Sequence, residues 1–159
     1  MYRLSNIAPG LIAAFGLATP AIAAASTQSV EDEIRRLEKE SNAAYAANDL
    51  DKYFGYYADD LSAIFYDART TLPEYRKFWT EYVRTAKQVI VSEKLTDMKI
   101  RIAPAGDTAI ASYQVDLKSR LAGNRITSEH AFETDIWFKR DGVWKLVHVQ
   151  YSLKTPAPE

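Results

Sequence analysis

The pattern of apolar and polar positions divides the chain into a helical first part and a strand-rich second part. Helical spacing of apolar residues predicts helices over residues 29–45, 50–57 and 71–86, and a strand over residues 61–66. Ser29 opens the first helix as part of a capping box, and Thr71 caps the third helix just before a proline at an early position.

From residue 89 onward every segment reads as a strand. The predicted strands are residues 89–103, 108–121, 125–140 and 143–153. The last three are separated by the turn signals Gly123-Asn124 and Asp141-Gly142. Helices followed by a long antiparallel meander predict an α+β fold, with the helices packed on one face of a curved sheet.

Two tight turns set the expected strand register. A two-residue loop at Asp141-Gly142 pairs Arg140 with Val143, and counting back pairs Trp137 with Leu146. A two-residue loop at Gly123-Asn124 pairs Ala122 with Arg125. The two turns assign the same residues of the shared strand to the same face, although a one-residue bulge would exchange part of this set.

The inner face of the sheet, which the helices should cover, is therefore expected to be mostly apolar. It comprises Ala109, Ala111, Tyr113, Val115, Leu117, His130, Phe132, Thr134, Ile136, Val147, Val149 and Tyr151. Facing the aromatic sides of the helices, this surface predicts a cavity for a small apolar or aromatic molecule. The predicted ligand-binding residues are Tyr45, Tyr57, Trp79, Tyr113, Phe132 and Tyr151.

The outer face carries tryptophans that the helices cannot reach, which predicts an interface between two copies of the chain. The predicted interface residues are Ile110, Asp135, Trp137, Trp144, Leu146 and His148. The same register pairs Asp135 with His148, and we interpret this pair as a polar contact within the homodimer interface.

His130 and Asp67 are the predicted catalytic residues. His130 could act as a general base beside a carbonyl group while Tyr113 or Tyr151 donates a hydrogen bond to the oxyanion. The alternative is a buried histidine bonded to a tyrosine hydroxyl. Because the register places His130 and His148 on opposite faces, no metal site is expected.

Composition and the N-terminus indicate where such a protein works. Residues 1–25 read as a secretory signal peptide, with Arg3 ahead of an apolar run, which leaves a single domain over 26–154 and a flexible tail over 155–159. A periplasmic or secreted location is expected, and the chain contains no cysteine. The net charge of −1 predicts no binding to nucleic acid, and no membrane association is expected after cleavage.

Short motifs carry a resemblance to a known family. Asn48-Asp49-Leu50, residues 106–111, residues 134–137 and residues 147–150 together resemble the SnoaL-like branch of the nuclear transport factor 2-like superfamily. The nearest pattern is the association domain of calcium/calmodulin-dependent protein kinase II and its bacterial relatives. The resemblance implies a cone-shaped, cystatin-like fold with three N-terminal helices closing over a curved sheet, an internal pocket, and dimerisation through the outer sheet face.

The resemblance also bears on chemistry. Where the kinase association domain carries pocket arginines, this chain has Val115, Thr127 and Tyr151. Asp67 matches a region in which some superfamily enzymes place a general base, and the alternative is that Asp67 is an ordinary turn residue. We expect an exported small-molecule-binding protein without a cofactor, whose enzyme version is an isomerase, dehydratase or cyclase acting by proton transfer. The alternative is a non-catalytic oligomerisation or protein-interaction module, which would have a filled interior instead of an open cavity.

Overall fold

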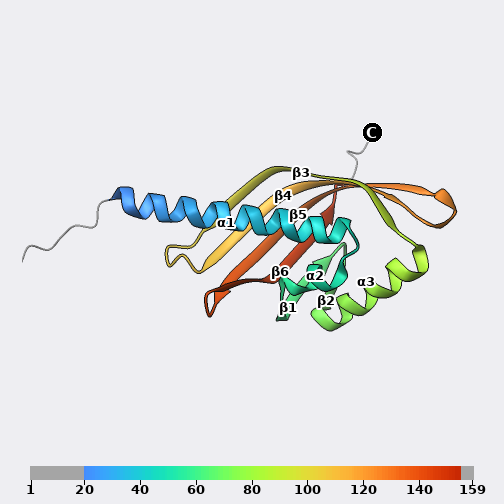
Figure 1. Cartoon of the computed structure of the whole chain (residues 1–159), viewed down its shortest axis with the longest axis horizontal. Helices are drawn as coiled ribbons and strands as arrows, with labels where there is room; N and C mark the ends of the chain where they lie inside the picture. The colour runs from blue at the N-terminus through green and yellow to red at the C-terminus, as the bar shows by residue number, and fades with distance from the viewer. Residues whose placement is uncertain (1–19, 155–159) are drawn as a thin grey trace, which may run out of the picture.

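The computed structural model describes residues 20–154, with side chains from residue 27 onward. The elements are α1 (Pro20–Ala46), α2 (Leu50–Gly55), β1 (Tyr57–Phe65), β2 (Ala68–Thr71), α3 (Leu72–Ala86), β3 (Val89–Ile102), β4 (Thr108–Arg120), β5 (Ile126–Arg140) and β6 (Val143–Leu153). The strands form one sheet in the order β2-β1-β6-β5-β4-β3. Figure 1 shows the long α1 lying across this sheet.

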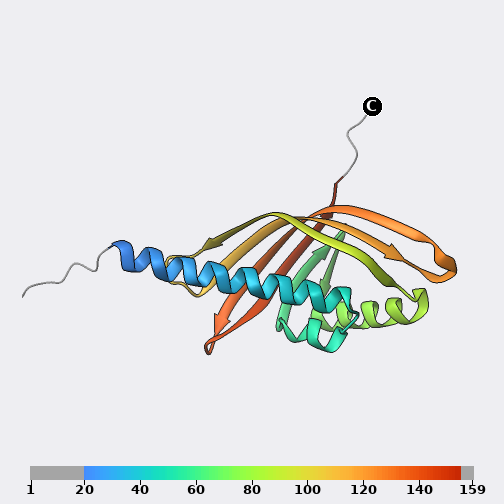
Figure 2. The same cartoon turned by 45° about the horizontal axis from the view of Figure 1, so that its top comes forward.

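The helices cover one face of the curved sheet, which confirms the α+β prediction (Figures 1 and 2). Helix α1 packs on β3 and β4, whereas α3 packs on β1 and β2. Two details differ from the expected arrangement. Helix α3 follows β1 and β2 in the chain, so the three described helices do not all precede the sheet, and β1 pairs with β6 in parallel.

Element boundaries were predicted well in the second half of the chain and less well at the start. The four long strands end within one or two residues of their predicted limits, but the short β2 was missed. Helix α1 begins at Pro20 instead of Ser29, because the alanine-rich stretch before Ser29 also favours a helix. The N-terminal part of the proposed signal peptide, residues 1–19, lies outside the described residues. Within residues 20–154, no helix is both long and apolar enough to cross a bilayer.

The loop between β4 and β5 corrects the predicted register of β5. Arg120 pairs with Ile126, so five residues form the loop instead of two. The backbone N–H of Leu121 donates to the carbonyl oxygen of Arg125 at 2.8 Å and closes it. Because side chains alternate along a strand, this one-residue shift exchanges the two faces of β5. His130, Phe132 and Ile136, which were predicted to face inward, therefore point away from the helices.

A bulge in β6 adds a second one-residue shift. The turn at Asp141-Gly142 gives the predicted pairs of Arg140 with Val143 and of Trp137 with Leu146. Beyond them, Ile136 pairs with His148, which leaves Val147 without an opposite residue. Tyr151 therefore returns to the inner face, as predicted, together with Val149.

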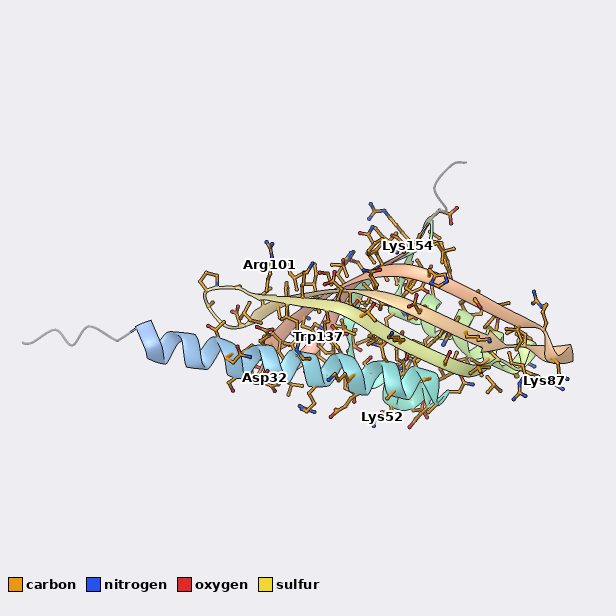
Figure 3. The ribbon with its side chains drawn as sticks, turned by 90° about the horizontal axis from the view of Figure 1, so that it is seen from above. Asp32, Lys52, Lys87, Arg101, Trp137 and Lys154 are labelled. Carbon is orange, nitrogen blue, oxygen red and sulfur yellow. The ribbon has the colours of Figure 1, made fainter. Side chains whose placement is uncertain are left out.

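These shifts place Trp137 in the core under α1, where Figure 3 shows it between the helix and the sheet. Trp137 is fully buried, and its Nε1–H donates to Glu38 Oε1 at 2.6 Å. The predicted interface is therefore wrong for four residues: Asp135, Trp137, Trp144 and Leu146 are all buried on the inner side. Only Ile110 and His148 of that set belong to the outer face.

Candidate functional site

An open cavity lies between the inner face of the sheet and the helices α1, α2 and α3. Its volume is about 360 Å³. Eight aromatic side chains line it: Tyr45, Tyr53, Phe65, Tyr66, Tyr75, Phe78, Trp79 and Tyr151. The size and the aromatic lining are typical of a site for a small organic molecule.

The aromatic wall arises from the spacing of residues on α1 and α3. Phe78 and Trp79 follow Tyr75 by three and four residues, so both lie on the same side of α3 as Tyr75. Across the cavity, the Tyr45 ring of α1 stacks on Trp79 with 5.3 Å between centroids. At the β1 end, Phe65 stacks on Tyr75 at 4.3 Å. These ring contacts hold the helices above the sheet and give the wall a fixed shape.

The floor of the cavity is acidic. Glu93 of β3 and Glu129 and Glu133 of β5 line it together with Val115. Glu93 and Glu129 both pair with Leu117, so they lie in one row across three strands. Glu129 and Glu133 share the inner face of β5, because they are four residues apart on a strand.

Burial perturbs two of these glutamates. It raises the pKa of Glu133 to about 8, with a further contribution from the nearby Glu38 and Glu93 carboxylates. Burial also raises the pKa of Glu93 to about 7. Glu129 Oε2, in contrast, accepts hydrogen bonds from the hydroxyls of Tyr66 and Tyr151, at 3.2 and 3.0 Å. At neutral pH Glu133 is therefore mainly protonated and can donate a proton inside the cavity.

A second acidic cluster lies behind the cavity, beneath α1. Glu38 and Asp135 are both almost fully buried, and the Tyr113 hydroxyl lies 3.1 Å from Glu38 Oε2 and 2.9 Å from Asp135 Oδ2. Burial raises the pKa of Glu38 and of Asp135, and the proximity of the two carboxyls raises that of Asp135 further. Two buried carboxyls in contact are stable only when they share a proton.

The predicted ligand-binding residues divide into three groups. Tyr45, Trp79 and Tyr151 line the cavity. Tyr57 and Tyr113 are buried but lie behind it: the Tyr57 hydroxyl donates to Tyr53, and Tyr113 belongs to the acidic cluster. Phe132 was placed wrongly, since it is 51% exposed on the outer face as a result of the shifted β5 register.

The predicted catalytic residues do not meet at the cavity. His130 lies exposed on the outer face, where its Nδ1 contacts Asp116 Oδ1, because the longer loop shifts β5 by one residue. Asp67 is exposed in the turn between β1 and β2 and is not part of the cavity lining.

The two histidines do not form a metal site. His148 also faces outward and contacts Ser62 Oγ at 2.9 Å, so the predicted pair with Asp135 does not form. Contrary to the prediction, His130 and His148 share a face. His148 pairs with Ile136, six residues from His130 along β5, which separates the histidines by roughly 20 Å. In the part of the chain that the structure describes, no group of three or more potential ligands could hold a metal ion.

The glutamates of the cavity floor were missed at the sequence level. Glu129, Ala131 and Glu133 are spaced two residues apart and therefore share one face of β5, and this spacing can be read from the sequence. These residues were assigned to the outer face because the preceding loop was counted as two residues. Glu93 carries no local signal, because its inward position depends on how β3 pairs with β4.

Comparisons with known proteins agree with this architecture. Residues 34–157 match the model of the SnoaL-like domain, and the chain belongs to that family. A comparison with curated proteins found no match.

Solved structures with a similar fold come from several organisms. A nuclear transport factor 2-like protein from Cytophaga hutchinsonii is 21% identical, with a TM-score of 0.67 over 78% of this chain and 98% of its own. The association domain of C. elegans calcium/calmodulin-dependent protein kinase II is 17% identical, with a TM-score of 0.66 over 80% and 98%. A candidate scytalone dehydratase from Novosphingobium aromaticivorans is 18% identical, with a TM-score of 0.71 over 82% and 89%. At these identities the likeness establishes the fold alone.

Proposed function

We propose that this protein binds a small organic molecule in the cavity beneath α1 and α3. The observation that carries the proposal is the open space of about 360 Å³ between aromatic walls. An assembly module whose interior serves only as a core would be expected to fill that space with side chains, because protein interiors are close-packed. The dimensions of the cavity suit a molecule with one or two rings.

A catalytic version of this function is supported by the acidic floor. Glu133, with a pKa of about 8, would donate a proton to a carbonyl or departing hydroxyl oxygen. Glu93, with a pKa of about 7, would accept a proton from the adjacent carbon. The net reaction is a cofactor-free isomerisation or dehydration, and the family also accommodates cyclisation. These two glutamates replace His130 and Asp67 as the proposed proton-transfer groups.

Filling the cavity tests the binding proposal. Val115 lines the floor, so Val115→Phe should project a ring into the space that a ligand would occupy. An aromatic fragment such as 1-naphthol, at about ten times its Kd, should raise the Tm of the unmodified protein by about 4 °C and that of the variant by far less. Thermal-shift assays and ligand-observed NMR measure this difference.

The control for this test is Val143→Phe, the same substitution at an exposed position at the start of β6. It should leave the thermal shift unchanged. Equal shifts in all three proteins would place the fragment outside the cavity and contradict the proposal. Circular dichroism of each variant establishes that it is folded before binding is compared.

We also propose that the protein forms a homodimer through the outer face of the sheet. The corrected register defines an outer-sheet patch made of Ile110, Phe132, Ile136 and Phe138. Three of these side chains are more than a third exposed in the single chain. Large apolar side chains grouped on one face are typical of an interface, and a two-fold axis would let the patch pack against its own copy.

A charge at the centre of the outer-sheet patch should separate the dimer. Ile110 pairs with Ile136, so Ile110→Arg would bury a guanidinium without a counter-charge in the interface. We expect at least a tenfold weaker dimer, detected as a fall to the monomer mass in size exclusion with light scattering. Glu81→Arg, at an exposed position on α3 and therefore away from the outer face of the sheet, should remain dimeric. A monomer for the unmodified protein at every concentration would contradict this proposal.

Export of the protein through residues 1–25 remains a proposal that rests on the sequence. Its support is the apolar run after Arg3 and the small residues at positions 21 and 23. A periplasmic or secreted location follows from it, as does the single domain over 26–154. In that location the outer-sheet patch and the cavity would be the two binding surfaces of the mature chain.

A further inference from the structure

We infer that the ligand of the cavity is an organic cation, in which an ammonium group is joined to an aromatic or apolar body. This inference rests on the proposed binding function and specifies the class of ligand. Three features of the cavity support it: the placement of three glutamates on the floor, the absence of an ion pair between these glutamates and any of residues 27–154, and the aromatic wall above them.

The three glutamates surround a common space. Glu93 and Glu129 flank Leu117 in one row, which separates their Cα atoms by roughly 10 Å. Glu133 lies four residues from Glu129 along β5, or roughly 13 Å. Val115 forms the floor between them. Glutamate side chains can span much of these distances, so a small charged group above Val115 would be approached by carboxyls from three sides.

The carboxyls at the inner end of the cavity have no positive partner. The side chain of Glu93 forms no hydrogen bond or ion pair with any of residues 27–154, and its pKa is raised by burial alone. Glu133 is close to further negative charge from Glu93 and Glu38. A buried carboxylate without a counter-charge is unstable, and a ligand that brings the counter-charge gains the interaction that the protein lacks.

The charged and titratable groups around this space belong to every element packed against it. They are Glu38 and Tyr45 of α1, Tyr53 of α2, Tyr66 of the β1–β2 turn, Arg69 of β2, Glu74 and Tyr75 of α3, Glu93 of β3, Tyr113 of β4, Glu129, Glu133 and Asp135 of β5, and Tyr151 of β6. Among the described side chains, Arg69 is the one basic residue in the cavity lining, and it is exposed on the β2 edge. The cavity therefore favours a positive ligand over a neutral one and disfavours an anion.

The aromatic wall adds a second attraction for a cation. The faces of tyrosine, phenylalanine and tryptophan rings are electron-rich and attract ammonium groups, most strongly where water is excluded. Tyr45 and Trp79 form one stacked pair over the cavity, and Phe65 with Tyr75 forms another. Rings above and carboxyls below are the combination by which proteins recognise substituted ammonium compounds.

Three probes of similar shape and different charge test this inference. 2-Phenylethylammonium, 2-phenylethanol and phenylacetate should be titrated into the full chain by NMR or calorimetry. We expect the cation to bind at least tenfold more tightly than the alcohol and the anion to bind more weakly than either. Glu133→Gln should reduce the preference for the cation at least fivefold while leaving the Kd of the alcohol unchanged. Glu81→Gln, which removes the same charge from an exposed position on α3, should change neither.

A ligand of fixed charge gives an independent readout. Benzyltrimethylammonium does not titrate, so any pH dependence of its binding comes from the protein. A cation binds to the ionised carboxyls, so its affinity should rise between pH 6 and pH 8.5 with release of protons. The pH dependence should weaken in Glu133→Gln and in Glu93→Gln, the second variant serving if the first does not fold.

The outcomes separate this inference from the function on which it rests. Equal affinity for the cation and the alcohol, with both displaced by Val115→Phe, would overturn the inference and leave small-molecule binding in place. No binding of any probe at about 10 mM, where even a millimolar Kd is detected, would overturn both. A cation preference that survives the loss of both Glu93 and Glu133 would also overturn the inference.

Discussion

The free energy of unfolding should fall by about 3–5 kcal/mol in the variant Trp137→Ala. The side chain of Trp137 is completely buried beneath α1. The ring of Tyr56 meets the indole edge-on, with 6.5 Å between the ring centroids. Removing the indole creates a cavity and also leaves Glu38 Oε1 without its 2.6 Å hydrogen bond. Urea unfolding followed by circular dichroism measures the change.

A matched variant on the same strand shows whether burial is the cause. Ile126 is 49% exposed, so Ile126→Ala should lower the free energy of unfolding by less than about 1 kcal/mol. Similar losses for the two variants would contradict the inward position of Trp137. The comparison therefore tests the strand register on which the cavity and the outer-sheet patch both depend.

The second large effect is a fall in stability as the pH rises. The folded state holds Glu133 with a pKa of about 8 and Glu93 with a pKa of about 7, whereas in the unfolded chain both titrate near the ordinary value of about 4.3. Between these values the folded state binds more protons, so stability is greatest at the acidic end and is lost as the pH rises through 7 and 8. We expect the free energy of unfolding to fall by on the order of 6 kcal/mol from pH 5 to pH 8.5, because each group loses about 1.4 kcal/mol per pH unit until the pH reaches its folded-state pKa.

Variants identify the source of this slope. Glu133→Gln removes the group with the higher of the two values and should make the protein more stable at pH 8.5 than the unmodified chain. Glu81→Gln, at an exposed position, should keep the original slope. Denaturant titrations at several pH values give the curves. A free energy of unfolding that is constant or rises over this range would contradict the raised pKa values of the cavity glutamates.

Much of the fold could be predicted from the sequence because its signals are local. Proline at the start of α3 and glycine in the turns mark the ends of elements, and the four long strands follow from alternation between such marks. The turn at Asp141-Gly142 has positive φ at both residues, as its composition predicts. The family resemblance is carried by short motifs of the same local kind.

The site could not be predicted equally well, because its location depends on counting residues across loops. A loop of five residues in place of two shifts β5 by one position, and the bulge at Val147 shifts β6 by one position. Each shift exchanges faces. The two shifts offset each other when registers are counted from the turns alone, so both turns predict His130 inside and Trp137 outside.

The cavity itself is a property of tertiary packing. Tyr45 and Trp79 were placed at it because helical spacing predicts which side of a helix faces the sheet. The role of Glu93 and Glu133 depends on which strands are neighbours and on how far α1 and α3 stand above them. Neither the order of the strands nor the position of the helices above them can be read from a short stretch of sequence.

Glu38 lies outside the cavity but influences its shape. On α1, Asn42 and Tyr45 follow Glu38 by four and seven residues and so project from the same side of the helix, into the cavity lining. The hydrogen bonds that Glu38 accepts from Trp137 and Tyr113 fix the rotation of α1 about its own axis. The orientation of the α1 side chains that line the cavity therefore depends on the buried Glu38. A substitution of Glu38 would change the shape of the cavity although Glu38 is not part of its lining.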